Sequence, residues 1–134
     1  MSVPHYHVVA AIIQYEERIL CVQKGRMDRD YLSYKYEFPG GKVEEGETPE
    51  EALRREVMEE LELDIMVGEA YLTVTHAYPD FTITLRSYLS EARNINTLML
   101  TEHIDYQWLL PTQLTQLHWA AADLPIINEL VKAR

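Results

Sequence analysis

The segment from residue 41 to residue 63, GKVEEGETPEEALRREVMEELEL, constrains the fold most, because it joins strong helix signals to crowded negative charge. It contains nine glutamates and only three basic residues. Thr48 and Glu51 have the spacing of a capping box, and Pro49 suits the first position of a helix. We therefore predict a helix from about residue 49 to about residue 61. Glutamates at i,i+3 and i,i+4 repel one another and destabilise a helix, so their crowding needs an explanation.

This predicted helix has two faces. Apolar residues at i, i+4 and i+8 form a stripe that would face a core: Leu53, Val57 and Leu61. Three glutamates fall together on the neighbouring face, within about 100° of arc: Glu56, Glu59 and Glu60. Converging carboxylates are hard oxygen donors, which suit Mg²⁺ or Mn²⁺ and not zinc. The alternative is a solvated acidic face without a ligand.

The rest of the chain predicts strands interspersed with helices. Strands are expected over residues 7–15, 18–24, 65–77, 81–89 and 106–110, the first two as a hairpin. A second helix is expected from about residue 124 to about residue 132. Residues 25–36 resemble a loop, and the sequence Phe-Pro-Gly-Gly at 38–41 is a turn signal. These elements indicate an α/β or α+β fold, with helices packed on a mixed sheet. No repeat or linker divides the chain, so we expect one domain over residues 1–134.

Composition excludes several kinds of partner. The net charge of −10 argues against a nucleic-acid backbone or an anionic membrane as a binding surface. An anionic small molecule would also be repelled unless a bound cation mediates its contact. Cys21 is the only cysteine, which favours a reducing compartment. The unbroken apolar run over residues 8–13 is too short for a signal peptide or a membrane span, so we expect a cytoplasmic protein.

The order of residues in the acidic segment resembles the Nudix hydrolase family. The family signature is G-x5-E-x7-R-E-U-x-E-E-x-G-U, in which U is a bulky aliphatic residue. Eight of its nine defined positions are matched here, by Gly41, Glu47, Arg55, Glu56, Val57, Glu59, Glu60 and Leu63. The departure is Glu62, which stands where the family has a glycine in a left-handed conformation. A non-glycine residue there costs roughly 1 kcal/mol and puts the geometry of that loop in question, but not the glutamate cluster.

The stretch KYEFPGGKVEEGETPEEAL is similar to the MutT branch of that family, the nucleoside triphosphate pyrophosphohydrolases. The resemblance implies an α/β/α sandwich containing a loop–helix–loop motif. It also implies a site for Mg²⁺, with Mn²⁺ as a substitute, whose ligands would be the Gly40 carbonyl, Glu56, Glu59, Glu60 and Glu102. Glu56 would be either a ligand or the base that activates water. Arg55 would orient a glutamate, and Glu47 would help to hold Gly41 and its loop against the helix.

Four further residues are candidates for substrate binding. Lys24, at the end of the second predicted strand, matches a basic phosphate-contacting position of the branch, although such a lysine can simply be solvated. Phe38 matches a position that lines the base pocket. Lys42 follows the two glycines, but Val43 replaces the hydroxyl residue that a P-loop requires. Asp123 falls at a base-contacting position of the branch, and it is equally placed to cap the second helix.

The resemblance implies hydrolysis of a nucleoside triphosphate to a nucleoside monophosphate and pyrophosphate, as housekeeping of the nucleotide pool. The substrate would be an oxidised nucleotide such as 8-oxo-dGTP, or a cytosine nucleotide such as CTP or dCTP. One alternative is another nucleoside diphosphate derivative, such as ADP-ribose or a dinucleoside polyphosphate. A second alternative is a non-catalytic module that binds nucleotides. The expected partner is a small-molecule nucleotide, with no nucleic acid and no membrane, for a monomer or homodimer.

Overall fold

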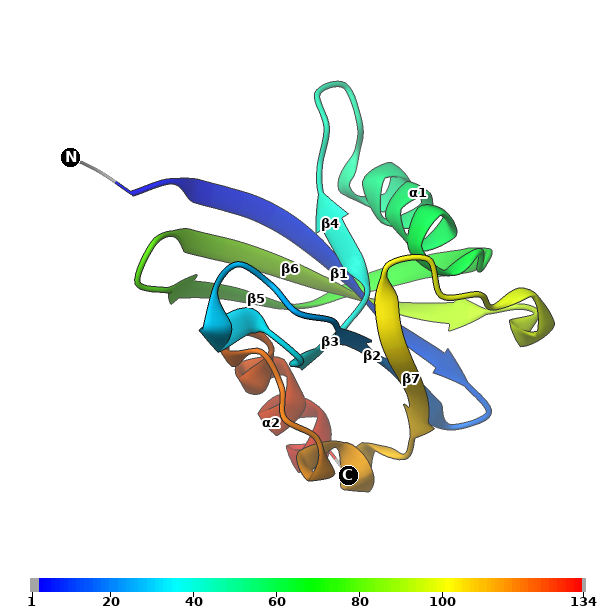
Figure 1. Cartoon of the computed structure of the whole chain (residues 1–134). Helices are drawn as coiled ribbons and strands as arrows, with labels where there is room; N and C mark the ends of the chain where they lie inside the picture. The colour runs from blue at the N-terminus through cyan, green and yellow to red at the C-terminus, as the bar shows by residue number, and fades with distance from the viewer. Residues whose placement is uncertain (1–2, 134) are drawn as a thin grey trace.

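The computed structural model describes residues 3–133 and consists of one mixed sheet with α1 and α2 on its opposite faces (Figure 1). The strands are β1 His5–Tyr15, β2 Arg18–Lys24, β3 Tyr36–Glu37, β4 Gly40–Lys42, β5 Ile65–Ala77, β6 Thr82–Ala92 and β7 His103–Leu109. The helices are α1 Pro49–Leu61 and α2 Leu124–Lys132. No helix in this part of the chain has the length and apolar character needed to cross a bilayer. The predicted fold class is confirmed.

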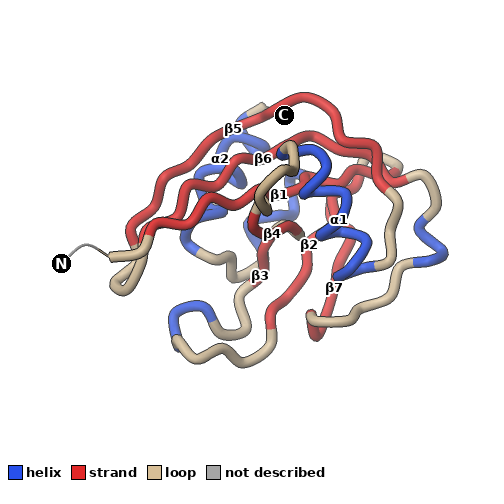
Figure 2. Tube along the Cα trace, turned by 90° about the horizontal axis from the view of Figure 1, so that it is seen from above, coloured by secondary structure: helices blue, strands red, loops and turns tan. Residues whose placement is uncertain are grey.

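The strand β1 organises the sheet. The order is β3-β2-β1-β6-β5, with β4 also paired to β1 and β7 also paired to β2. The pair β1–β6 is parallel and the other strand pairs are antiparallel, which makes the sheet mixed. Figure 2 shows β1, β6 and β5 side by side as long strands. On its other edge β1 changes partner, because residues 8–10 pair with β4 and residues 14–15 pair with β2.

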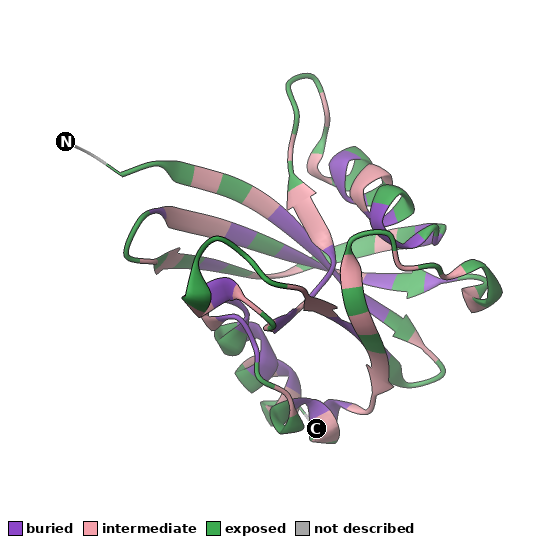
Figure 3. Cartoon of the chain, in the orientation of Figure 1, coloured by how far each residue is buried: buried purple, intermediate pink, exposed green. Residues whose placement is uncertain are grey.

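The central residues of β1 are buried on both faces of the sheet. Val9, Ala11 and Ile13 pack in the core that contains the apolar stripe of α1. Ala10 and Ile12 pack in the second core, which contains the apolar residues of α2. Burial is concentrated between the helices and the sheet (Figure 3). The unbroken apolar run in the sequence follows from this position between two layers.

Local signals determine both ends of α1. The Thr48 hydroxyl accepts a hydrogen bond from the Glu51 N–H at 3.1 Å, and the Glu51 carboxylate accepts one from the Thr48 N–H at 2.9 Å. At the other end Glu62 has φ 52° and ψ 35°, in the left-handed region. Its N–H donates to the Met58 carbonyl at 3.0 Å, and its own carbonyl accepts from the Thr97 hydroxyl at 2.9 Å. The loop therefore keeps the geometry that a glycine would adopt, despite the side chain.

The hairpin predicted between the first two strands is also confirmed. Glu16 and Glu17 have φ values of 48° and 69° and connect β1 to β2. Positive φ at both residues of a two-residue turn matches the right-handed twist of the flanking strands.

Short strands account for most of the differences from prediction. The predicted turn at residues 38–41 is wrong at its second half, because Gly40 and Gly41 belong to β4 and pair with β1. A Cβ atom at Gly40 would overlap the carbonyl oxygen of Val9, so glycine permits this close approach. The strand β7 begins at His103 and not at residue 106, because its first residues alternate between polar and apolar too briefly to be recognised.

Candidate active site

The cleft beside β4 has a volume of about 570 Å³ and brings together residues that are distant in the sequence. It is lined by eight of the predicted site residues: Lys24, Phe38, Gly40, Gly41, Lys42, Glu60, Glu102 and Asp123. The remaining predicted residues lie on α1 and its preceding loop, behind Glu60: Glu47, Arg55, Glu56 and Glu59. The cleft and the acidic helix are therefore neighbours, and Glu60 belongs to both.

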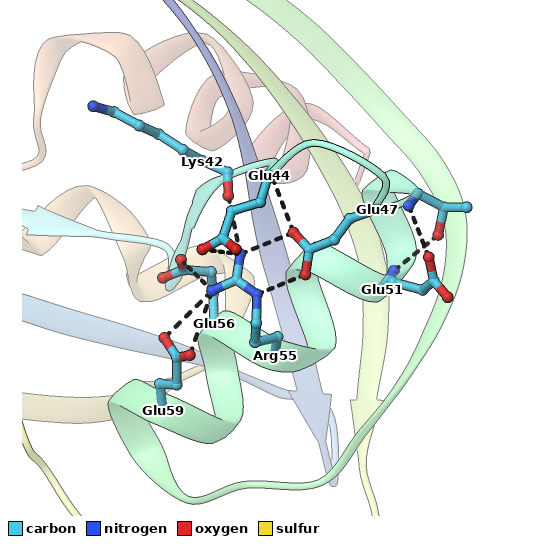
Figure 4. A network of polar contacts seen from close by, with 8 residues as sticks. Lys42, Glu44, Glu47, Glu51, Arg55, Glu56 and Glu59 are labelled. Carbon is cyan, nitrogen blue, oxygen red and sulfur yellow. Dashed lines mark hydrogen bonds and ion pairs between the residues drawn. The ribbon is translucent and has the colours of Figure 1, made fainter.

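Arg55 is the centre of a charged network on α1 (Figure 4). Its guanidinium donates to both carboxylate oxygens of Glu47, at 2.6 and 3.0 Å. It also donates to the backbone carbonyl of Lys42 at 3.3 Å. The Glu47 carboxylate in turn accepts from the Glu44 N–H at 2.9 Å. The hydrogen bonds from Arg55, assisted by that from Glu44, lower the pKa of Glu47 to about 2. These contacts fasten the loop before α1 to the helix itself.

The other side of the Arg55 guanidinium faces two of the predicted metal-binding glutamates. It donates to Glu56 at 2.9 Å and to both oxygens of Glu59 at 3.4 Å. Glu56 is mostly buried, whereas the Glu59 side chain is 58% exposed. The bond to Glu47, more than that to Glu56, raises the pKa of Arg55 above its already high value. Arg55 therefore compensates carboxylate charge in this structure.

Glu60 is the most buried of the helix glutamates. It is 5% exposed, and its Oε1 is a buried atom without a hydrogen-bond partner among the described residues. Burial raises the pKa of Glu60 well above its usual range, and a hydrogen bond with Glu56 and the nearby Glu37 and Glu102 add to this effect. A carboxylate in such surroundings ionises when a cation is present to offset its charge.

The chemistry of these side chains matches that of a divalent-cation site. As placed, no three His, Cys, Asp or Glu side chains within residues 3–133 are arranged to hold one metal ion. The Glu60 Oε1 atom, which has no hydrogen-bond partner among the described residues, could nevertheless serve as a metal ligand. A Cβ atom at Gly41 would overlap the Glu56 carboxylate, so glycine leaves room for that group. Glu56, Glu59 and Glu60 would offer only carboxylate oxygens to such an ion, and an all-oxygen set of this kind suits Mg²⁺.

Asp123 also lines the cleft and is buried, with 5% of its surface exposed. Its Oδ2 accepts a hydrogen bond from the Phe38 N–H at 3.0 Å, and the Phe38 ring packs on Trp119 with 5.0 Å between centroids. The prediction that Asp123 caps α2 is wrong, because its side chain makes no capping bond and points to the β3–β4 connection instead. Burial, reinforced by the charge of Glu37, raises the pKa of Asp123 to about 8, against the opposing effect of the Phe38 N–H.

Two residues of the cleft, Glu37 and His103, were not identified from the sequence. The Glu37 carboxylate pairs with Lys24 Nζ at 3.5 Å through one oxygen and with His103 Nε2 at 2.9 Å through the other. Lys24 is therefore not simply solvated. Glu37 lines the cleft together with Glu60 and Asp123, and its charge contributes to the raised pKa of both. Alternation with Phe38 would have indicated Glu37 only if the two-residue strand β3 had been recognised.

Further unpredicted contacts involve three residues that line the cleft, Arg29, Tyr78 and Phe81. Arg29, in the loop after β2, donates to Asp80 at 2.7 Å in the turn between β5 and β6. The same guanidinium lies over the Phe81 ring, 5.1 Å from its centroid. Tyr78, which also lines the cleft, accepts from the Ala122 N–H at 3.0 Å. The two hydrogen bonds join residues 51 and 44 positions apart, and no local pattern links them.

The fold and the site together define a class of α/β/α sandwich in which a glutamate-rich loop–helix–loop borders the cleft. The family model described as NUDIX domain matches residues 4–130, so the chain belongs to the Nudix family.

Individual relatives narrow the class further. The chain is 34% identical over 128 residues to a CTP pyrophosphohydrolase of Escherichia coli (strain K12), covering 95% of this chain and 92% of the relative. It is 37% identical over 83 residues to an 8-oxo-dGTP diphosphatase of Proteus vulgaris, covering 62% and 73% of the two chains. A solution structure of a MutT protein from methicillin-resistant Staphylococcus aureus 252 matches with a TM-score of 0.76 and 38% identity, covering 99% of this chain and 100% of that one. The predicted class, a MutT-like Nudix pyrophosphohydrolase, is confirmed.

Proposed function

We propose that this enzyme hydrolyses a nucleoside triphosphate to the monophosphate and pyrophosphate, with Mg²⁺ as cofactor and Mn²⁺ as a substitute. The observation that supports this most is the composition of the cleft. A buried hydrogen-bonding group, Asp123, lines the same cavity as the acidic residues Glu60 and Glu102, and two lysines line it as well. A base, phosphates and a cation each have a chemically matched partner there.

In this proposal Glu56, Glu59, Glu60, Glu102 and the Gly40 carbonyl hold the cation. Bound Mg²⁺ neutralises phosphate charge and lowers the pKa of coordinated water, which is the chemistry that pyrophosphate hydrolysis needs. The ion also allows an anionic substrate to approach a protein with a net charge of −10. Glu56, which accepts a hydrogen bond from Arg55, serves either as a ligand or as the base that takes a proton from water.

Lys24 and Lys42 are the proposed phosphate contacts. Both line the cleft, and each is held by another side chain of the cleft. Lys24 pairs with Glu37, while Lys42 lies over the ring of Tyr6. A lysine ammonium has three N–H donors, so one contact leaves donors for phosphate oxygens.

Asp123 is the proposed base-contacting residue, and Phe38 the proposed apolar wall beside it. Since the Phe38 N–H occupies Oδ2, the other oxygen is available to the substrate. An ionised Asp123 accepts from an exocyclic amine such as that of cytosine, whereas a protonated Asp123 donates to an oxidised purine. The relatives named for CTP and for 8-oxo-dGTP support these two candidate substrates respectively.

A substrate panel tests the proposal. Purified protein with Mg²⁺, and separately with Mn²⁺, is offered 8-oxo-dGTP, dGTP, CTP, dCTP, ADP-ribose and a dinucleoside polyphosphate, and product release is measured. We expect pyrophosphate from at least one triphosphate. Turnover of ADP-ribose alone would contradict the triphosphate assignment, and no turnover of any compound would contradict catalysis.

The base contact has its own test. Asp123→Asn is expected to change the ratio of kcat/KM between the cytosine and the oxidised guanine nucleotide, because an amide both donates and accepts. Asp64→Asn, on the exposed surface and paired with Arg54, is the matched control. An unchanged ratio in Asp123→Asn would refute the base contact.

We further propose a cytoplasmic protein in which residues 1–134 form one domain, acting without nucleic acid or membrane as a monomer or homodimer. The negative charge of the chain supports the lack of anionic partners. Cys21 is buried and its pKa is raised to about 12 by that burial, which supports a structural thiol in a reducing compartment. Light scattering of the purified protein distinguishes the two oligomeric states.

A further inference from the structure

Two contacts hold the backbone of Lys42, the last residue of β4, in place. It pairs with Val8 in the sheet, and its carbonyl accepts from Arg55 at 3.3 Å. Figure 4 shows that its side chain extends away from Arg55 and from the labelled glutamates. The backbone therefore belongs to the charged network of α1, while the ammonium belongs to the cleft.

The Lys42 ammonium rests on an aromatic ring. Its Nζ lies 4.1 Å from the centroid of the Tyr6 ring. Among residues 3–133, it makes none of the ion pairs found within 4.0 Å, although the chain has 22 acidic and 12 basic residues. Four glutamates of α1 and its preceding loop are paired with Arg55 instead: Glu44, Glu47, Glu56 and Glu59. The charge of Lys42 is thus held in place without being neutralised.

The Tyr6 ring is itself well supported. Tyr6 lies within β1 and pairs with Ile83 of β6, which fixes its backbone. Its ring packs edge-on against Phe81, with 5.5 Å between centroids, and Phe81 is buried. Tyr6, Phe81 and Lys42 all line the cleft. The ring therefore presents its face to the lysine from a position that cannot move freely.

We propose that Tyr6 is a positioning residue for phosphate binding, and that it acts by holding the Lys42 ammonium in the cleft. A ring face attracts an ammonium electrostatically but takes up none of its charge, so the remaining N–H donors stay available to an anion. A carboxylate in the same place would neutralise the lysine. Without the ring, the flexible side chain would reach the glutamates of α1 and compete there with the divalent cation. This inference rests on the proposed function, because it presumes a phosphate-bearing substrate.

Two substitutions of Tyr6 test the role of the ring. Tyr6→Leu removes the aromatic face, whereas Tyr6→Phe keeps it and removes only the hydroxyl. We expect Tyr6→Leu to raise the KM for the triphosphate about fivefold with kcat changed less than twofold, a size typical of a partly exposed cation–π contact. Tyr6→Phe should retain the KM of the unmodified enzyme. An unchanged or lower KM in Tyr6→Leu, or an equal rise in both variants, would overturn the proposal.

A double-mutant cycle shows whether Tyr6 acts through Lys42. In a Lys42→Met background the Tyr6→Leu substitution should change KM by less than twofold, because the cation it serves is absent. A further fivefold rise would overturn the proposal, since the ring would then act by another route. Thermal unfolding of each variant identifies any general loss of structure, which would appear in both backgrounds.

Binding of inorganic tripolyphosphate separates this inference from the proposed function. Calorimetry with Mg²⁺ present needs no nucleotide and no turnover, so it remains informative if the enzyme hydrolyses none of the triphosphates. A fivefold weaker affinity in Tyr6→Leu, and not in Tyr6→Phe, would support the role of the ring. Equal affinity in all three proteins, or no binding to the unmodified protein, would overturn it.

Discussion

Glu62 offers the sharpest quantitative test of the fold, because a glycine is expected at its position. The residue closes α1 with φ 52° and ψ 35°. A side chain in the left-handed region costs roughly 1–2 kcal/mol relative to a right-handed conformation. Its carboxylate also lies at the negative end of the helix, an unfavourable contact of about 0.3–1 kcal/mol for an exposed group. Both costs would disappear in Glu62→Gly.

The gain is reduced by the unfolded state. Glycine gives the unfolded chain extra conformational freedom, which offsets about 0.4–1 kcal/mol. We therefore expect Glu62→Gly to raise the free energy of unfolding by about 1 kcal/mol. Glu62→Ala is the matched control, because it removes the charge but keeps the Cβ atom and its strain. It should gain only the charge contribution of about 0.3–1 kcal/mol and should remain less stable than Glu62→Gly.

Urea unfolding measures both variants, and thermal unfolding checks them. For a chain of 134 residues, about 1 kcal/mol corresponds to an increase in Tm of about 3–4 °C. If Glu62→Gly is no more stable than Glu62→Ala, then the left-handed backbone at this residue stores no strain. That result would refute the reasoning, as would a loss of stability.

Three further predictions concern the site. Glu59→Gln should lower kcat roughly a hundredfold without loss of helix content, because a proposed metal ligand is removed. The same change at the exposed Glu50 should leave kcat unchanged, and similar activity in the two variants would contradict the assignment of Glu59. Because the pKa of Asp123 is raised, the folded protein keeps a proton that the unfolded chain releases. The free energy of unfolding should therefore decrease as the pH rises from about 4 to about 8. The contribution of this group is at most about 1.4 kcal/mol per pH unit. Urea unfolding at several pH values should show a smaller decrease in the free energy of unfolding for Asp123→Asn than for the unmodified protein. An identical decrease in the two proteins would contradict the raised pKa of Asp123. Because the pKa of Glu60 is also raised, Mg²⁺ would have to displace a proton from its carboxyl group on binding. Added Mg²⁺ should therefore raise the free energy of unfolding more at pH 8 than at pH 6, and EDTA should reverse the increase. The same increase in Glu60→Gln would contradict the proposed metal site.

The elements that could be predicted from sequence are those determined by neighbouring residues. The bounds of α1 follow from Thr48, Pro49 and Glu51 together with an apolar stripe, all within a few turns of one another. The same is true of α2. In contrast, β4 depends on the close approach of Gly40 to β1, some thirty residues earlier, and no local signal distinguishes this strand from a turn.

The contacts of the site also comprise some that are local in the sequence and some that only the tertiary fold creates. The Arg55–Glu47 pair spans eight residues and follows from the family motif. Asp123 and Phe38 are separated by 85 positions, and only the packing of the C-terminal segment against β3 brings them together. The local sequence indicated only that Asp123 could cap α2. In the structure its side chain bonds the Phe38 N–H instead. The Glu37–His103 pair, 66 positions apart, could not be predicted from the sequence either, because only the tertiary fold brings these residues together.

Arg55 concentrates the charge balance of this site in one side chain. Its guanidinium bonds Glu47 on one side and Glu56 and Glu59 on the other. One positive charge therefore fastens the loop before α1 and also faces two of the proposed metal ligands. A single substitution of Arg55 would release both at the same time, whereas a substitution of any one of the three glutamates would leave the other contacts in place.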